Sequence, residues 1–347
     1  MPRHEPLRGT LAFKVKATCV MSAVLALTAC ATSSTSAPKV APATSIKQVV
    51  IIVKENHSFD NYFGGLEDPV LQLPHCPSLA AQAGCQYAST DIPAYYDYAQ
   101  EFGYADMYFT DIRGPSWPND LMMIAGQTPL ASDPPPPLKT WVCPTTCYDL
   151  PTIGDELTQA DVTWRNYGLK LYDPFLSIKR YATDSVHNVD GDNFFNDVSE
   201  GNLPAVSWIR PDPGVSEHPG YDIRVGERWT VNVVDALMRS QYWSSTAILI
   251  TWDDAGDVPD HVAPPVLERT ASGKALRYGY RVPLLVISPF THQGQVSHQL
   301  LSHVSLLKFI ENIFHLPSLT SRDRDAASPD EFFDLDMAPR APMFVKP

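Results

Sequence analysis

The chain has 347 residues and a formal net charge of −13, from 39 acidic and 26 basic residues. Apolar residues make up 44% of it and charged residues only 19%, so it can build a large hydrophobic core, and global disorder is excluded. A general nucleic-acid binder, or a protein that docks on anionic membranes, needs the opposite sign of charge, so the composition argues against both partners.

The first thirty residues have the pattern of a secretory signal. Basic residues come first, and an apolar run follows over residues 17–29. Small residues flank Cys30 at the end of this run. That arrangement resembles the bacterial lipobox, in which the cysteine is lipidated and becomes the first residue of the exported protein. Ordinary cleavage nearby, for example after Ala31, is the alternative.

These patterns divide the chain into three predicted segments. Residues 1–29 are expected to be a signal peptide, and residues 30–45, rich in Ala, Thr, Ser and Pro, a flexible tether. Residues 46–347 are expected to form one folded domain. The protein is therefore predicted to be exported by a bacterium, either to the periplasm or to the outer membrane as a lipoprotein with a lipid anchor at Cys30.

Four cysteines follow Cys30 in the chain. Because an exported chain meets oxidising conditions, two disulfides are favoured over free thiols. Of the three possible connectivities, we predict the near-neighbour pairs Cys76–Cys85 and Cys143–Cys147. A zinc site is the alternative, but the spacings lack a tight Cys-x-x-Cys pair.

Strand and helix patterns alternate along the predicted domain. Residues 46–53 are almost all β-branched, which is typical of a strand buried on both faces of a parallel sheet. Further strands are expected at 162–167, 205–209, 246–252 and 282–288, and helices at 153–160, 228–239 and 302–314. This alternation predicts an open α/β sheet. Segments 64–105 and 133–151 are expected to be loop insertions, and the part after Pro317 irregular.

Polar residues directly follow two of the predicted strands. Glu55 and Asn56 follow the first, and Asp253 and Asp254 follow the strand at 246–252. In open α/β sheets the working residues lie just past the carboxyl ends of strands. Adjacent carboxylates raise each other's pKa unless a cation or base lies between them, so these oxygens could hold one divalent metal ion. The alternative is that they are loop acids bound by backbone amides.

A serine stands at the start of a predicted helix. The segment from Arg113 to Asp120 leads into an apolar run, and Pro118 suits the first turn of a helix. Ser116 would lie just before that helix, either as a nucleophile or as a plain N-cap. The unpaired N–H groups of a helix start form a natural phosphate site.

Three histidines stand in polar loops. They are His57, His218 and His261. Histidine suits proton transfer near neutral pH and can donate to a phosphoryl oxygen. For each of them a structural or merely exposed role is the alternative.

Taken together, these segments resemble the bacterial phosphoesterase family that contains phospholipases C and acid phosphatases. The resemblance is carried, in the family's order, by ENHSFDNYFG at 55–64, GPSWPN at 114–119, EHP at 217–219, TWDD at 251–254 and DHVAPP at 260–265. It covers roughly residues 46–316 and identifies residues 46–347 as a phosphoesterase domain. It implies an alkaline-phosphatase-like α/β fold with a mostly parallel central sheet and helices on both faces.

The resemblance also assigns roles to the site residues. Glu55, Asn56, Asp253 and Asp254 are implied to bind one divalent metal ion. Oxygen ligands favour Ca²⁺, Mg²⁺ or Mn²⁺ over Zn²⁺. Ser116 is implied to be the nucleophile, and His218 and His261 the active-site histidines.

Two positions depart from the family's pattern. Asp120 stands where members often have His or Arg, which puts phosphate affinity in doubt unless the side chain turns away. Asp254 stands where many members have Glu, and because both are carboxylates, metal ligation survives.

The predicted function is metal-dependent hydrolysis of a phosphate ester through Ser116 and a phosphoserine intermediate, with an acid-phosphatase-like activity favoured. A phospholipase C is the main alternative. The aromatic residues Tyr95, Tyr96, Tyr98, Phe102 and Tyr104 could line a lipid entry or a choline cage, or could simply pack an insertion. A sulfatase needs Arg at position 120 and is disfavoured, and a non-catalytic surface lipoprotein is the remaining alternative.

Overall fold

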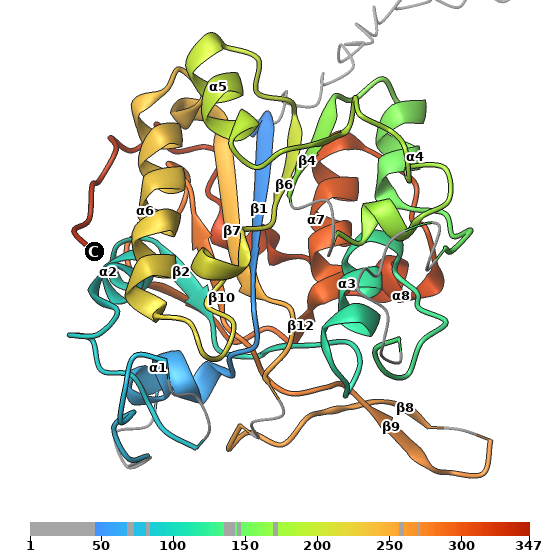
Figure 1. The fold of residues 1–347 in the computed structure, drawn as a ribbon, viewed down its shortest axis with the longest axis horizontal. Helices are drawn as coiled ribbons and strands as arrows, with labels where there is room; N and C mark the ends of the chain where they lie inside the picture. Colours follow the sequence, from blue (N-terminus) through green and yellow to red (C-terminus); the bar gives the residue numbers. More distant parts are fainter. Residues whose placement is uncertain are drawn as a thin grey trace, which may run out of the picture. The chain divides into compact units, whose positions relative to one another are not determined.

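A mixed sheet of eight strands runs through the part of the chain that the computed structural model describes (Figure 1). The described residues are 46–67, 73–80, 84–134, 143, 147–168, 173–256, 260–269 and 271–347. The predicted signal peptide, the tether and Cys30 lie outside them. The sheet order is β11-β2-β10-β7-β1-β6-β4-β5.

The strands of this sheet are β1 Gln48–Lys54, β2 Gly103–Ala105, β4 Trp164–Tyr167, β5 Asn188–Val189, β6 Val206–Ile209, β7 Thr246–Trp252, β10 Leu284–Ile287 and β11 Gln295–Ser297. Two small ribbons accompany it: β3 Tyr108–Phe109 with β12 Leu301–Ser302, and β8 Val266–Arg269 with β9 Ala275–Arg277. The helices are α1 Phe59–Glu67, α2 Pro93–Glu101, α3 Ser116–Ala125, α4 Ile153–Gln159, α5 Asn193–Glu200, α6 Ile223–Arg239, α7 His303–Phe314 and α8 Ser321–Asp325.

Strand β1 lies at the centre of the sheet and pairs in parallel with β7 on one side and β6 on the other. In this register Ile51 lies beside Leu249 of β7 and Trp208 of β6. Both faces of β1 are buried, which explains its unbroken β-branched composition. The three parallel strands therefore bring their carboxyl ends to one edge of the sheet.

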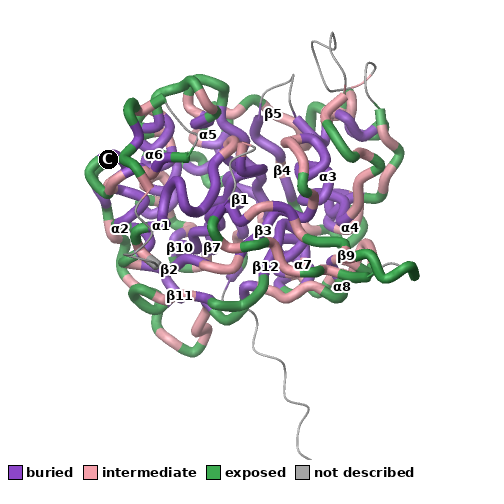
Figure 2. The backbone as a smooth tube through the Cα atoms, turned by 90° about the horizontal axis from the view of Figure 1, so that it is seen from below, coloured by how far each residue is buried: buried purple, intermediate pink, exposed green. Residues whose placement is uncertain are grey.

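Helices cover both faces of the sheet, as predicted. Helices α2, α5 and α6 pack together on one face, and α3, α4, α7 and α8 on the other. Seen from below, the two groups flank a buried core of strands (Figure 2). Helix α6 buries one apolar stripe, with Val233, Val234 and Leu237 fully covered. In the described residues, no helix has both the length and the apolar character needed to cross a membrane.

Several predicted elements differ from the structure. The segment at 64–105 is not a plain insertion, because it contributes α2 and strand β2 to the main sheet. Strand β10 was expected as one more strand of a mostly parallel sheet, yet it runs antiparallel to both β7 and β2. Helix α6 begins five residues before the expected position 228. The part after Pro317 includes the short helix α8.

The predicted disulfide pairing is confirmed. Cys76 is bonded to Cys85 and Cys143 to Cys147. Each bond closes a short loop, and Cys76 and Cys85 are buried against the core beneath α1. The aromatic residues at 95–104 are also buried, so they pack the core and do not form an exposed choline cage.

Candidate active site

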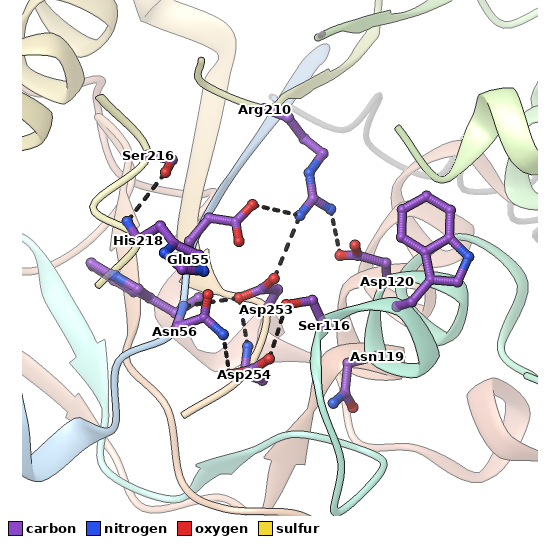
Figure 3. A network of polar contacts seen from close by, with 12 residues as sticks. Glu55, Asn56, Ser116, Asn119, Asp120, Arg210, Ser216, His218, Asp253 and Asp254 are labelled. Atoms are coloured by element: carbon purple, nitrogen blue, oxygen red, sulfur yellow. Dashed lines mark hydrogen bonds and ion pairs between the residues drawn. The ribbon is translucent and has the colours of Figure 1, made fainter. Parts of the chain in front are cut away.

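Three neighbouring strands end at one place and present polar side chains there (Figure 3). Glu55 and Asn56 follow β1, and Asp253 and Asp254 follow β7. Arg210 follows β6, the other neighbour of β1. Because the three strands are parallel and adjacent, residues that are more than 150 positions apart in the chain meet at one edge of the sheet.

The backbone at Asn56 turns sharply to make this meeting possible. Asn56 has a φ of 57°, in the left-handed region that asparagine tolerates better than most residues. Its N–H donates to Asp253 Oδ1 over 3.0 Å, and its Nδ2 donates to Asp254 Oδ1 over 2.6 Å. Gly256 packs against this turn, where an added Cβ would lie 2.8 Å from the Asn56 carbonyl oxygen. These contacts hold the carboxyl ends of β1 and β7 together.

Ser116 joins these residues from helix α3. Its hydroxyl donates to Asp254 Oδ2 over 3.0 Å. Ser116 is the first residue of α3 and does not precede it, which corrects the predicted helix start. The N–H of Trp117 donates to Asp133 Oδ1 over 3.0 Å, so one of the free N–H groups expected to bind phosphate already has an acidic partner.

Asn119 fixes the loop that leads to the serine. It is fully buried, and its Nδ2 donates to the carbonyl oxygens of Ile112, Gly114 and Pro115. Its Oδ1 accepts from the N–H of Ile112 over 2.9 Å. The Asn119 side chain therefore acts on the loop backbone, and Ser116 is held at a defined place.

A cavity of about 400 Å³ opens beside the strand ends. It is lined by Glu55, Asn56, Pro115, Ser116, Trp117, Asp120, Asp133, Arg210, Pro211, Pro213, Ser216, His218 and Tyr221. The cavity thus joins the predicted nucleophile, two of the four predicted metal ligands and one predicted histidine. Asp253 and Asp254 bond to Asn56 and Ser116 of this lining, as the dashed lines of Figure 3 show.

The acids at the strand ends repel one another. Burial, followed by the charge of Asp253, raises the pKa of Glu55 to about 8, although Arg210 opposes the shift. Burial and Asp253 likewise raise the pKa of Asp254 to about 7. Two buried oxygens, Asn56 Oδ1 and Asp253 Oδ2, have no hydrogen-bond donor among the described residues. Clustered carboxyls and unsatisfied oxygen acceptors are what a bound cation would neutralise.

Arg210 is the site residue that our sequence analysis missed. Its guanidinium pairs with Asp120 through Nη1. Nη2 lies 3.4 Å from Glu55 Oε1 and 3.6 Å from Asp253 Oδ2. Arg210 directly follows the predicted strand at 205–209, so the strand-end rule could have found it. The ion pair also explains how an acid is accommodated at position 120, because Asp120 of α3 has a basic partner at the end of β6.

His218 lines the cavity and is exposed to solvent. The residue before it, Glu217, is buried and has a φ of 69°. Glu217 binds Lys54 Nζ over 3.0 Å and accepts from the hydroxyls of Tyr62 and Tyr95. This buried network anchors the loop that contains His218.

Gly226 of α6 makes room for that network. An added Cβ at Gly226 would lie 2.3 Å from Glu217 Cγ, so no larger residue fits beside the buried carboxylate. His57 also belongs to this region and is buried, with Nε2 2.7 Å from the Glu217 carbonyl oxygen and Nδ1 2.5 Å from Asn61 Oδ1. Burial lowers the pKa of His57, which supports the structural alternative for this histidine.

His261 does not line the cavity with Ser116. Its Nδ1 lies 2.7 Å from Asp60 Oδ1, in a cluster with Asp260. Among the described residues, these three side chains form the group of His, Cys, Asp and Glu whose ligand atoms all lie within 4.8 Å of one another. The strand-end acids Glu55, Asp253 and Asp254 are spaced more widely, so their side chains would have to draw together to share an ion. Arg281 already pairs with both acids, at 3.1 Å from Asp60 Oδ1 and 2.9 Å from Asp260 Oδ1. The structure therefore separates the two predicted histidines into different surroundings.

The sheet, the helices on both of its faces and the polar strand ends define an α/β protein with a mixed, mostly parallel central sheet. A solved structure with the same fold is that of Ps i-CgsB in complex with k-i-k-neocarrahexaose. The two superpose with a TM-score of 0.52 at 11% sequence identity, over 82% of this chain and 75% of that one. At this identity the likeness concerns the fold alone.

The chain belongs to the Phosphoesterase family, whose pattern matches residues 78–317. It is 29% identical to phospholipase C B of Mycobacterium tuberculosis over 276 residues, which cover 67% of this chain and 52% of the relative. It is 30% identical to the non-hemolytic phospholipase C of Pseudomonas aeruginosa, over 66% of this chain and 40% of the relative. The chain thus spans about half the length, or less, of these curated relatives.

Proposed function

We propose that this protein hydrolyses phosphate esters, with Ser116 as the nucleophile. The observation that carries the proposal is the position of the Ser116 hydroxyl. It lies in the cavity wall and donates to Asp254, at the point where the ends of β1 and β7 gather their oxygen atoms. Membership of the Phosphoesterase family agrees with this chemistry.

The strand-end residues suit one divalent metal ion. Glu55, Asn56, Asp253 and Asp254 would hold it, because two of their oxygens have no donor within the described part of the chain and two of their carboxyls have raised pKa values. Four oxygen donors favour a hard cation such as Ca²⁺, Mg²⁺ or Mn²⁺. Such an ion supplies positive charge that stabilises an ionised serine oxygen and polarises a phosphoryl oxygen.

Ser116 and His218 have different roles in the proposed reaction. The Ser116 hydroxyl passes its proton to Asp254, to which it donates. Its oxygen attacks phosphorus in line with the leaving oxygen and forms a phosphoserine, while the ester bond breaks. His218 lines the cavity, which supports its proposed role as the acid that protonates the leaving alcohol. Water then attacks the phosphoserine, which returns the serine and releases the phosphorylated product.

The charge of the cavity favours a phosphodiester of the kind that phospholipases C cleave. Acids at the cavity and directly behind it outnumber its one guanidinium, that of Arg210. A diester has one negative charge, whereas a monoester has up to two and meets stronger repulsion. The relatives named phospholipase C agree with this choice. The acid-phosphatase activity favoured from sequence stays a prediction, and the assay below separates the two.

We also infer that the protein is exported. The observed disulfides support an oxidising compartment. Anchoring through Cys30 is part of this proposal and follows from the sequence pattern alone.

The test compares the wild-type protein with Ser116→Ala. Turnover of p-nitrophenyl phosphorylcholine and p-nitrophenyl phosphate is measured with a chelator and with each added metal. We expect metal-dependent cleavage, faster for the diester, and a loss of at least about 10³-fold in Ser116→Ala. Ser199→Ala, an exposed serine on α5 at the opposite end of the sheet, is the matched control and should keep full activity.

Two further measurements separate the parts of the proposal. Mass spectrometry of the quenched enzyme should find phosphate on Ser116, and an active enzyme without that adduct contradicts the nucleophile assignment. Added metal should raise the melting temperature of the wild type but not that of Asp253→Asn, which retains the oxygen that accepts from the N–H groups of Asn56 and Asp254. Equal metal stabilisation of both proteins would place the ion elsewhere.

A further inference from the structure

The guanidinium of Arg210 is built into the wall of the cavity. The residue is only 8% exposed, yet it lines the cavity from the end of β6. Among the described residues that line this cavity, Arg210 is the one with a permanent positive charge. A buried arginine facing an open cavity is costly unless it is paired, and Asp120 provides that pairing.

Helix α3 places this ion pair next to the nucleophile. Ser116 and Asp120 are four residues apart on α3, so their side chains lie on the same face, one turn apart. Figure 3 shows the Arg210 guanidinium reaching down to Asp120, with Ser116 on the same side of the helix. An ester attacked by Ser116 would therefore lie in a cavity that the guanidinium of Arg210 also lines.

The contacts of Arg210 leave it able to take a ligand. Nη1 is held by Asp120, but Nη2 lies 3.4 Å from Glu55 and 3.6 Å from Asp253, at or beyond the range of a good hydrogen bond. A guanidinium has five N–H donors in a rigid fork, which suits two partners at once, such as a carboxylate and a phosphoryl oxygen.

We propose that Arg210 binds a non-bridging oxygen of the phosphoryl group during attack by Ser116, and that Asp120 is the positioning residue that aims it. This inference rests on the function proposed above and adds a substrate-binding residue to it. Asp120 is then compatible with phosphate binding, because it positions the guanidinium of Arg210.

The test uses Arg210→Gln, Asp120→Asn and the double variant, which replaces the ion pair by two amides and avoids an unpaired buried charge. We expect Arg210→Gln to lower kcat/KM for p-nitrophenyl phosphorylcholine by about 10²-fold. Its affinity for inorganic phosphate, measured by calorimetry, should fall by about tenfold or more. Arg239→Gln, at an exposed arginine of α6, is the matched control and should change neither value.

The Asp120→Asn variant separates positioning from direct binding. It should lower kcat/KM less than Arg210→Gln does, and it should have no further effect when Arg210 is already Gln. Additive effects of the two substitutions contradict the positioning role. A lower melting temperature of Arg210→Gln with unchanged phosphate affinity and kcat/KM would show a structural role only and would overturn the proposal.

The outcomes for Arg210 and for the enzyme activity are distinguishable. If the wild type cleaves esters and Arg210→Gln does so equally well, the inference fails and the proposed function stands. If the wild type cleaves neither ester but binds phosphate in an Arg210-dependent way, the proposed function fails and the anion site stands. If it neither cleaves esters nor binds phosphate, both are overturned.

Discussion

Two acidic clusters, formed from the same kinds of residues, behave differently in this molecule. The cavity cluster consists of Glu55, Asp120, Asp253 and Asp254 around Arg210, and the Arg281 cluster consists of Asp60, Asp260 and His261 around Arg281. Each combines acids from distant parts of the chain with one arginine. They differ in how completely the acid oxygens are satisfied and in whether a cavity opens onto them.

In the Arg281 cluster, every carboxylate oxygen of Asp60 and Asp260 accepts a hydrogen bond. Arg281 bonds to both acids, and the backbone N–H of Asp60 donates to Asp260 Oδ2 over 3.0 Å. The N–H of His261 donates to Asp60 Oδ2, and the N–H of Val262 donates to Asp260 Oδ1, the oxygen that also accepts from Arg281. These bonds join the start of α1 to the loop after β7. We interpret this cluster as a structural clamp.

In the cavity cluster, the oxygen atoms are only partly satisfied by hydrogen-bond donors. Asn56 Oδ1 and Asp253 Oδ2 have no donor among the residues that the structure describes, and the contacts of Arg210 with Glu55 and Asp253 are long. The sequence places the two clusters side by side, since Asp254 and Asp260 are six positions apart. Acid content alone therefore does not define a binding site, whereas unsatisfied acceptors beside an open cavity do.

The largest expected effect is a loss of stability when the Arg281 cluster is disrupted. Arg281→Gln removes the cation between Asp60 and Asp260 and leaves buried acids without a charged partner. We expect a loss of about 3–5 kcal/mol in the free energy of unfolding, measured by urea denaturation. Arg239→Gln, at an exposed ion pair, should change it by less than about 0.5 kcal/mol. Unchanged stability with lost activity would instead make Arg281 part of the chemistry.

The second prediction compares the two histidines, one at each cluster. His218→Gln should lower kcat for an ester with a poor leaving group by about 10²-fold, because a general acid is removed from the cavity. His261→Gln should lower kcat much less, since His261 bonds to Asp60 and does not line the cavity. A matched pair of kcat measurements at saturating substrate decides this, and equal losses contradict the separation of the two clusters.

The smallest effect concerns a pair of acids outside both clusters, Glu311 and Asp323. Burial, followed by a hydrogen bond with Asp323, raises the pKa of Glu311 to about 8. In the unfolded chain this carboxyl has its ordinary, lower pKa, so the folded state retains the proton as pH rises. Its stabilising contribution is therefore full in acid and is lost as pH rises through about 8.

The test of this pair is a stability profile against pH. The wild type should lose on the order of 1 kcal/mol more than Glu311→Gln between about pH 5 and about pH 8.5, because Gln has no proton to release. Parallel profiles for the two proteins would show that Glu311 is already ionised in the folded state. The result tells whether this acid pair is neutralised by a shared proton.

The sequence by itself predicted much of the fold and of the candidate site. The β-branched run of β1 and the pattern of β7 located two central strands, because a strand buried on both faces must be apolar throughout. The strand-end rule then pointed to Glu55, Asn56, Asp253 and Asp254, which the structure brings together. The near-neighbour cysteine pairs were also readable, because short loops favour them.

Only the tertiary structure decided which strands are neighbours and which donors each acid meets. Arg210 gained its place because β6 lies beside β1, which no local pattern encodes. The reversed direction of β10 and the entry of β2 into the sheet are likewise set by long-range pairing. His218 and His261 both stand in polar loops of the sequence, yet His218 lines the cavity and His261 belongs to the Arg281 cluster. Local patterns fix burial and strand ends, whereas the partners of a charged side chain depend on packing between distant segments.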